Sequence, residues 1–340
     1  MKKLLFILFI SIAAIASAQT AEERASEHMN QHNWFKLQRE LTANKDSISP
    51  FLREFGEAML AHFFNRPQIA CEAIGKLLET QQENMGFDNT ASMVSLLSEN
   101  LSKLGKNDEA ANTLKGFCDQ LVGKLDNTFL APFLNREKEY RALSAYSLFG
   151  WHRPEKDLII PFQLDSIGKS GSCAIMFQGS LNGKAQRILL DTGAGVNVVT
   201  PETAKAHGMK ILDANVIASG VKLGNGQLAL AEEMKIGDLT LHNIPFYVLD
   251  MKTGDEKADL YTKHLEAIIG LPILNQLQEV KLDFHAQRMT VPHTLTTAPE
   301  YAPNISFQNA NILDIELTYD HELLNMNLDS GSDVSRFNYL

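Results

Sequence analysis

One short pattern occurs twice in this chain and restricts its fold more than any other feature. Each copy reads as a strand, a turn and a second strand that ends on Asp, then Thr or Ser, then Gly. The first copy is CAIMFQGSLNGKAQRILLDTG and ends at Gly193, and the second is ILDIELTYDHELLNMNLDSG and ends at Gly331. The repeat predicts two related β lobes, each of which presents one aspartate, Asp191 or Asp329, at a tight turn.

The first of these aspartates lies where burial is costly. Asp191 directly follows Leu189 and Leu190, and a carboxylate loses free energy when it is buried behind such residues. Gly193 lets the backbone turn its N–H groups toward the carboxylate, and the Thr192 hydroxyl can fasten the loop to a neighbour. Two carboxyl groups a few ångströms apart cannot both ionise, so they share one proton. Such a pair predicts general acid–base hydrolysis through an activated water, with no covalent intermediate, no metal and no other cofactor.

The hydrophobic period changes once along the chain, at GWHRPEKD, residues 150–157. Before it, stretches such as FLREFGEAMLAHFF place apolar residues at helical spacing. Two turns, NRP at 65–67 and GKND at 105–108, separate helices about 40 residues apart, a spacing typical of helical repeats. This region loosely resembles tetratricopeptide-like helix pairs, and an unrelated helical bundle remains the alternative.

After residue 158 the chain reads as short strands with many turns. Asn182-Gly183 joins two of them in the strongest short hairpin signal. SGVKLGNGQLALAEEMKIGDLTLHNIPFYVLD predicts four more strands, with one turn near Asn225-Gly226. One short helix is expected in TPETAKAHG, capped by Thr200. We therefore predict a chain with α and β domains, in which helices precede a small closed β barrel or sandwich.

Three separated pieces of the second region carry a resemblance to a family. They are LLDTGAGVNVVTPETAKAHGMK, ASGVKLGNGQLAL and AIIGLPILNQLQEVKLDFHAQRMTV. In sequence and spacing they are similar to the single lobe of the retropepsin-like aspartic proteases, including their bacterial exported branch. The resemblance implies that Asp191 is the catalytic aspartate and that Thr192, Gly193 and Ala194 form the active-site loop. It also implies a flap that closes over substrate, with the residues Gly220, Gly224, Asn225 and Gly226.

The mechanism needs a second aspartate, and the sequence offers two sources. One is Asp329 with Ser330 and Gly331, which resembles the start of a second lobe as in two-lobed pepsin-like enzymes. The other is Asp191 of a second chain in a homodimer. Only 11 residues follow Asp329, so we expect an incomplete, truncated second lobe. A plain polar turn at Asp329 remains the alternative. A trypsin-like serine protease is not favoured, because Ser330 lacks a suitably placed general base; His321 is expected in a turn.

The N-terminal residues indicate where the protein acts, and the net charge limits its possible partners. MKKLLFILFISIAAIASA predicts a cleaved secretory signal, hence export to the periplasm or beyond, with no membrane span afterwards. The net charge of -10 argues against nucleic acid as a partner. We predict an exported aspartic endopeptidase acting on peptides or proteins; a catalytically inactive peptide-binding or assembly module is the rival. The predicted segments are the signal at 1–18, the helical domain at 19–150, the protease lobe at 158–293 and the partial lobe at 300–340.

Overall fold

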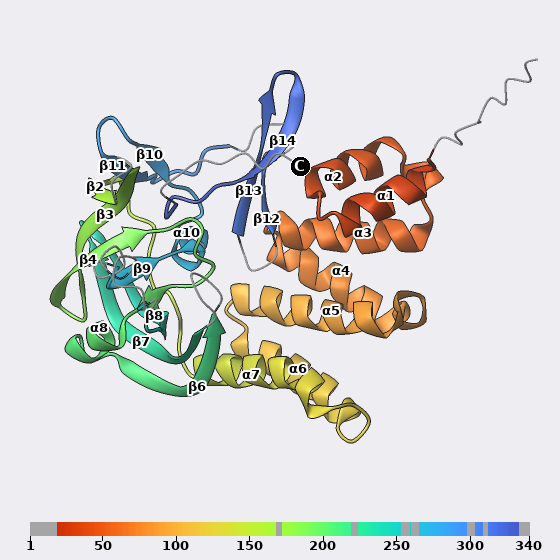
Figure 1. The fold of residues 1–340 in the computed structure, drawn as a ribbon, viewed down its shortest axis with the longest axis horizontal. Coiled ribbons are helices and arrows are strands. Elements are labelled where there is room, and N and C mark those ends of the chain that lie inside the picture. The colour runs from red at the N-terminus through yellow and green to blue at the C-terminus, as the bar shows by residue number, and fades with distance from the viewer. Residues whose placement is uncertain are drawn as a thin grey trace, which may run out of the picture.

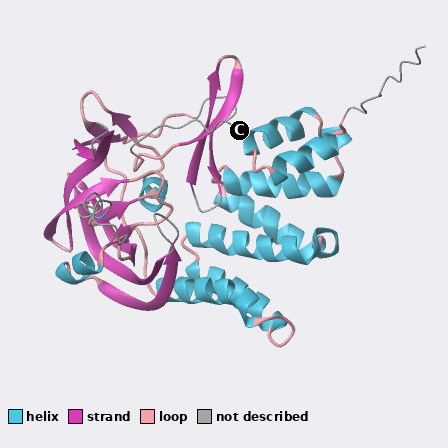
Figure 2. Ribbon diagram, viewed as in Figure 1, coloured by secondary structure: helices cyan, strands magenta, loops and turns pink. Residues whose placement is uncertain are grey.

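The computed structural model describes most of the chain after its N-terminal segment. The described residues are 19–167, 172–218, 224–252, 259, 265–297, 303–308 and 312–332. Helices come first and a β-rich part follows, so the predicted fold class is confirmed (Figure 2). Within these residues, no helix has both the length and the apolar character that a membrane crossing needs.

The helical region is a series of helices in which each packs against the next (Figure 1). Its boundaries follow local signals: the Thr20 side chain caps the first helix in a capping box with Glu23, and Pro50 and Pro67 occupy first turns. The elements are α1 (Ala21–Asn30), α2 (Trp34–Ala43), the 3-10 turn η1 (Lys45–Ser47), α3 (Pro50–Phe63), α4 (Pro67–Thr80), α5 (Gln82–Lys103), α6 (Asn107–Leu121) and α7 (Asn127–Leu143). Tetratricopeptide-like repetition stays a prediction.

The barrel region is an eight-stranded sheet that folds back on itself. Its strand order is β2-β3-β4-β9-β5-β8-β7-β6, and an additional pairing between β3 and β7 joins the sheet to itself. The strands are β2 (Gln163–Ile167), β3 (Ser172–Leu181), β4 (Lys184–Leu190), β5 (Val198–Val199), β6 (Lys210–Ala218), β7 (Gly224–Ile236), β8 (Leu239–Val248) and β9 (Ala267–Ile269). Apolar side chains from these strands fill a large core that includes Phe177 and Phe246, and others form two smaller clusters.

Smaller elements complete the barrel region. Strands β1 (Leu158–Pro161), β10 (Lys281–Asp283) and β11 (Arg288–Val291) form a separate sheet in the order β1-β11-β10. Two short helices, α8 (Pro201–Ala206) and α10 (Leu271–Leu277), lie between strands. The Thr200 side chain accepts a hydrogen bond from the Thr203 N–H at the start of α8, as the sequence predicts.

The last described residues form a three-stranded antiparallel sheet of their own. Strands β12 (Ile305–Gln308), β13 (Ile312–Tyr319) and β14 (Glu322–Asn327) pair in that order. The strand–turn–strand that precedes Asp329 is therefore present, as β13, a turn at Asp320-His321, and β14. Figure 1 shows this sheet between the barrel strands and the first helices.

The predicted turn at Asn225-Gly226 is wrong. Both residues lie inside β7, where Asn225 pairs with Ile217 and Gly226 pairs with Val216 of β6. Two strands, β7 and β8, occupy the described part of the segment for which the sequence suggested four strands. The ladder between β6 and β7 extends past the Asn-Gly pair, because a continuous antiparallel pairing satisfies more backbone groups than an early turn.

Candidate active site

The first Asp-Thr-Gly loop leaves the middle of the large sheet. Strand β4 ends at Leu190 and runs parallel to β9, with Leu190 opposite Ile269. The Asp191 N–H donates to the Ile269 carbonyl over 3.0 Å, and the Gly193 N–H donates to Asp191 Oδ1 over 2.8 Å. The backbone of this loop therefore fixes where the Asp191 carboxyl group lies.

A second set of contacts holds the far side of the same loop. The Ala194 carbonyl accepts from the Leu271 N–H at the start of α10 over 2.9 Å. A Cβ at Gly270 would collide with the Ala194 carbonyl, so only glycine allows this approach. Asn197, which is 2% exposed, accepts from the Gly270 N–H over 3.0 Å and donates to the Pro245 carbonyl over 3.1 Å. Asn197 is a site residue that sequence reasoning missed; a lone Asn inside the apolar run GVNVV was its signal.

The Asp-Ser-Gly loop leaves the small sheet in a similar way. Strand β14 ends at Asn327, and the next residue, Leu328, donates its N–H to the Leu313 carbonyl of β13 over 2.8 Å. The Gly331 N–H donates to Asp329 Oδ1 over 2.9 Å. This bond matches the one between Gly193 and Asp191 in the first loop, so the two loops have the same local geometry.

The two loops exchange hydrogen bonds through their hydroxyl side chains. Thr192 Oγ1 donates to the Leu328 carbonyl over 2.8 Å and accepts from the Ser330 N–H over 2.9 Å. Reciprocally, Ser330 Oγ donates to the Leu190 carbonyl over 3.0 Å and accepts from the Thr192 N–H over 2.9 Å. Four bonds thus join segments that lie far apart in the chain and fix the distance between the aspartates that precede each hydroxyl residue.

The aspartates meet across this interlock. A Cβ added to Gly193 would lie 2.5 Å from Asp329 Oδ1, and one added to Gly331 would lie 2.5 Å from Asp191 Cγ, so each carboxyl group lies against the opposite glycine. Burial first, and then the negative charge of Asp329, raise the pKa of Asp191 to about 6. A hydrogen bond with the Asp329 side chain raises this pKa further. Asp191 is half-buried, whereas Asp329 is exposed.

The remaining predicted site residues are those of the flap. Gly224, Asn225 and Gly226 begin β7, opposite the end of β6, and a Cβ at Gly226 would collide with the Val248 carbonyl of β8. Gly220 lies outside the described residues. The role of this hairpin as a flap therefore stays a prediction.

Ser330 is engaged in the loop interlock and is not paired with a histidine there. Its hydroxyl donates to the Leu190 carbonyl, while His321 lies in the exposed turn between β13 and β14. This arrangement gives Ser330 a bracing role in the loop, equivalent to that of Thr192.

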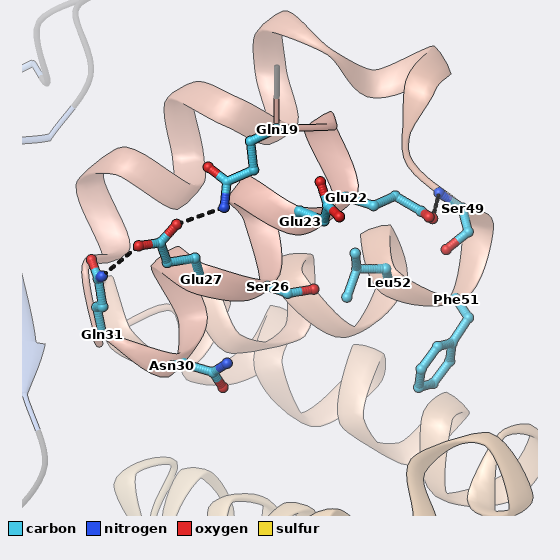
Figure 3. A pocket seen from close by; sticks show the side chains of 10 residues that line it. All are labelled: Gln19, Glu22, Glu23, Ser26, Glu27, Asn30, Gln31, Ser49, Phe51 and Leu52. Carbon is cyan, nitrogen blue, oxygen red and sulfur yellow. Dashed lines mark hydrogen bonds between the residues drawn. The ribbon is translucent and has the colours of Figure 1, made fainter. Parts of the chain in front are cut away.

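A surface hollow of about 690 Å³ lies elsewhere, on α1 and the start of α3 (Figure 3). Its carboxylates already have partners: Glu22 accepts from the Ser49 N–H over 2.7 Å, and Glu27 accepts from Gln19 and Gln31 over 2.8 Å. The residues that line this hollow include neither Asp191 nor Asp329.

Comparison with known proteins relates the barrel region to proteases. Residues 177–276 match the family model described as gag-polyprotein putative aspartyl protease. The matched range includes the Asp-Thr-Gly loop and Gly270, which packs closely against the Ala194 carbonyl. This part of the chain is therefore similar to aspartyl protease domains. No curated protein matches the chain.

Several solved structures are distantly similar. A retropepsin-like aspartic protease from Rickettsia conorii is 16% identical, with 39% of this chain and 88% of that chain covered and a TM-score of 0.26. The retroviral protease-like domain of Ddi1 from Leishmania major is 16% identical, with 46% and 96% covered and a TM-score of 0.23. Basic 7S globulin from soybean is 13% identical, with 47% and 58% covered and a TM-score of 0.31.

Proposed function

We propose that this chain, with its aspartyl-protease-like segment, is an aspartic endopeptidase in which Asp191 and Asp329 form the catalytic pair. The observation that carries the proposal is the reciprocal hydrogen bonding of Thr192 and Ser330. It joins two Asp-[Thr/Ser]-Gly loops of one chain, so that their carboxyl groups share a hydrogen bond. Within one chain, this arrangement supplies both acids that peptide hydrolysis needs.

The proposed mechanism follows from one shared proton. Below about pH 6 the pair retains that proton, and burial favours Asp191 as its site. Asp329, which is exposed, takes a proton from a water held between the two carboxyl groups. The hydroxide oxygen bonds to the peptide carbonyl carbon while Asp191 donates its proton to the carbonyl oxygen. Collapse of the tetrahedral intermediate breaks the C–N bond: the amine leaves with the proton that Asp329 accepted, and one hydroxyl group of the intermediate returns its proton to Asp191 as the carboxylic acid forms.

Substitution of each aspartate tests the proposal. Asp191→Asn and Asp329→Asn should each reduce hydrolysis of a peptide pool at pH 4 to 6 by about 10³-fold or more, because the pair acts as a unit. Asp238→Asn, in the turn between β7 and β8, is the matched control and should keep full activity. Binding of peptides by the parent chain without any turnover would contradict the proposal and support the peptide-binding rival.

The same variants decide whether the second acid comes from another chain. If Asp191 of two chains formed the pair, Asp329→Asn would remain active. A mixture of the two inactive variants tests pairing of Asp191 with Asp329 across chains, because it would then recover activity. We expect neither result, since the pair lies within one chain.

We also propose that the protein is exported. The support is the pattern of residues 1–18: Lys2 and Lys3, an apolar stretch, and Ala16-Ser17-Ala18. Sequencing of the mature protein from cell fractions should find Gln19 as the first residue in the periplasm or the medium. Retention of Met1 on a cytoplasmic protein would overturn this assignment.

A further inference from the structure

One apolar cluster joins the helices, the barrel and the small sheet. We call five of its residues, one from each of five elements, the shared core: Trp34 of α2, Phe63 of α3, Leu271 of α10, Phe307 of β12 and Leu313 of β13. Trp34 and Phe63 stack with ring centroids 3.9 Å apart, and Phe307 is only 4% exposed. The side chains of three separate parts of the chain are therefore packed together. Figure 1 shows β12 beside α3.

Two members of the shared core are bonded directly to the two aspartate loops. The Leu271 N–H donates to the Ala194 carbonyl over 2.9 Å, and the Ala194 N–H donates to the Asp191 carbonyl over 3.2 Å. On the other side, the Leu313 carbonyl accepts from the N–H of Leu328, which directly precedes Asp329. The backbone of each loop thus lies one hydrogen bond from a residue whose side chain packs against the helical region.

The small sheet depends on this packing. Among the described residues of β12, β13 and β14, Phe307 is the only apolar side chain that is buried. A three-stranded sheet needs an apolar face packed on a core for stability, and here the helices supply that core. Polar contacts add to it: Arg39 of α2 forms two 2.8 Å bonds to Glu316 of β13, and the Lys103 ammonium group lies 4.9 Å from the centroid of the Phe307 ring.

We propose that the shared core is a positioning element of the active site, through which the N-terminal helices set the distance between Asp191 and Asp329. This inference rests on the proposed function for its catalytic consequence. The helices are then part of the scaffold that holds the second aspartate, rather than a separable binding module. Phe307 is the central positioning residue, and it acts through β12 and β13.

The test compares two buried substitutions of similar severity. Phe307→Leu loosens the shared core, whereas Leu114→Ala opens a cavity in α6, where Leu114 is 1% exposed and packs in a different cluster. Thermal unfolding establishes a temperature at which both variants are folded. Under those conditions, kcat for peptide hydrolysis should fall by about 10- to 100-fold in Phe307→Leu with little change in KM, because a misplaced catalytic group loses rate before binding. Leu114→Ala should keep the parent value.

A second readout does not need enzymatic activity. The carboxyl carbon of Asp191 is titrated by ¹³C NMR in the intact protein, with Asp191→Asn used to assign the signal. Separation from Asp329 should move the pKa of Asp191 from near 6 toward its ordinary value in Phe307→Leu and leave it unchanged in Leu114→Ala. A shift in a chain without peptidase activity would reject the proposed function and retain the positioning role. Equal titration curves and equal kcat in the two variants would overturn the positioning role.

A milder variant keeps the test decisive if Phe307→Leu does not fold. Arg39→Gln removes the ion pair with Glu316 without opening a cavity. It should shift the Asp191 titration in the same direction by a smaller amount, and Lys115→Gln, which breaks an exposed pair within α6, should not. An unshifted titration in Arg39→Gln would then count against the positioning role.

Discussion

The two aspartate loops have nearly the same local structure and very different support. The first lies inside an eight-stranded sheet with its own core, where β4 and β9 flank it. The second follows β14, an edge strand of a three-stranded sheet that packs on the helices. From this difference we infer that the Asp-[Thr/Ser]-Gly tripeptides determine the hydrogen bonds between the loops. Packing far from the loops determines how rigidly each loop is held.

Alanine at the two loop glycines, Gly193 and Gly331, should reduce activity more than any other change to the loops that keeps both aspartates. Each added methyl group would lie 2.5 Å from an atom of the opposite aspartate, so Gly193→Ala and Gly331→Ala must both push the carboxyl groups apart. The less supported second loop should move in both cases. We expect each variant to lose about 10²-fold or more in kcat/KM, because displacement of about an ångström has that cost.

Thermal unfolding, measured alongside the kinetics, distinguishes displacement of an aspartate loop from unfolding of the whole protein. The barrel should stay folded in both glycine variants, because the second loop relieves the contact. Gly75→Ala in α4 is the matched control: open space surrounds Gly75, so alanine there should raise stability by about 0.5–1 kcal/mol and leave activity unchanged. Full activity in Gly331→Ala would show that the loops are not this close.

Removal of the Thr192 or the Ser330 hydroxyl group should have a smaller effect, which is measured as a loss of stability. Thr192→Val and Ser330→Ala each remove the hydroxyl partner of one N–H and one carbonyl in the opposite loop. The cost is about 1–3 kcal/mol in the free energy of unfolding, and it should be larger for Thr192, which is buried, than for half-buried Ser330.

Urea unfolding of the single and double variants measures the coupling between the loops. The double variant should lose less stability than the two single losses combined, because both hydroxyl groups belong to one network. Thr42→Val, where the hydroxyl only donates to Gln38 in a helix, should change little. Simple additivity would mean that the two loops are braced independently.

Local patterns predicted those parts of the site that local chemistry determines. Asn182 and Gly183 have φ values of 49° and 75°, as a tight hairpin turn requires, and Thr200 caps α8. The Asn-Gly pair at Asn225 carries the same signal but continues a strand, because pairing with β6 outweighs the turn preference. A dipeptide signal therefore holds only where no longer ladder competes with it.

The support of the second loop has no local signature in the sequence. Phe307 reads as an ordinary strand residue, and nothing near it indicates that Trp34 and Phe63 complete its surroundings. The same is true of Tyr247, whose hydroxyl donates to Glu139 of α7 over 2.7 Å and ties the barrel to the helices. Such contacts depend on how whole domains pack, so sequence periods identified the two regions but not their dependence on each other.

The pH dependence of stability gives the smallest expected effect and the most direct measure of unequal burial. The folded-state pKa of Asp191 is raised to about 6 from 3.8, so the stability that protonated Asp191 provides is complete below about pH 4 and is lost as the pH rises through 6. Asp191→Asn should therefore be more stable than the parent by about 1–2 kcal/mol at pH 7, a value reduced for partial exposure, and equal to it near pH 4.

Asp329→Asn divides this gain into its two causes. It removes the repulsion between the carboxyl groups but leaves Asp191 half-buried, so its gain at pH 7 should be smaller than that of Asp191→Asn. Urea unfolding at pH 4, 5.5 and 7 measures both, with Asp238→Asn as the surface control. Because burial is the larger cause of the raised pKa of Asp191, equal gains in the two variants would mean that repulsion dominates and that the loops are equally buried in solution.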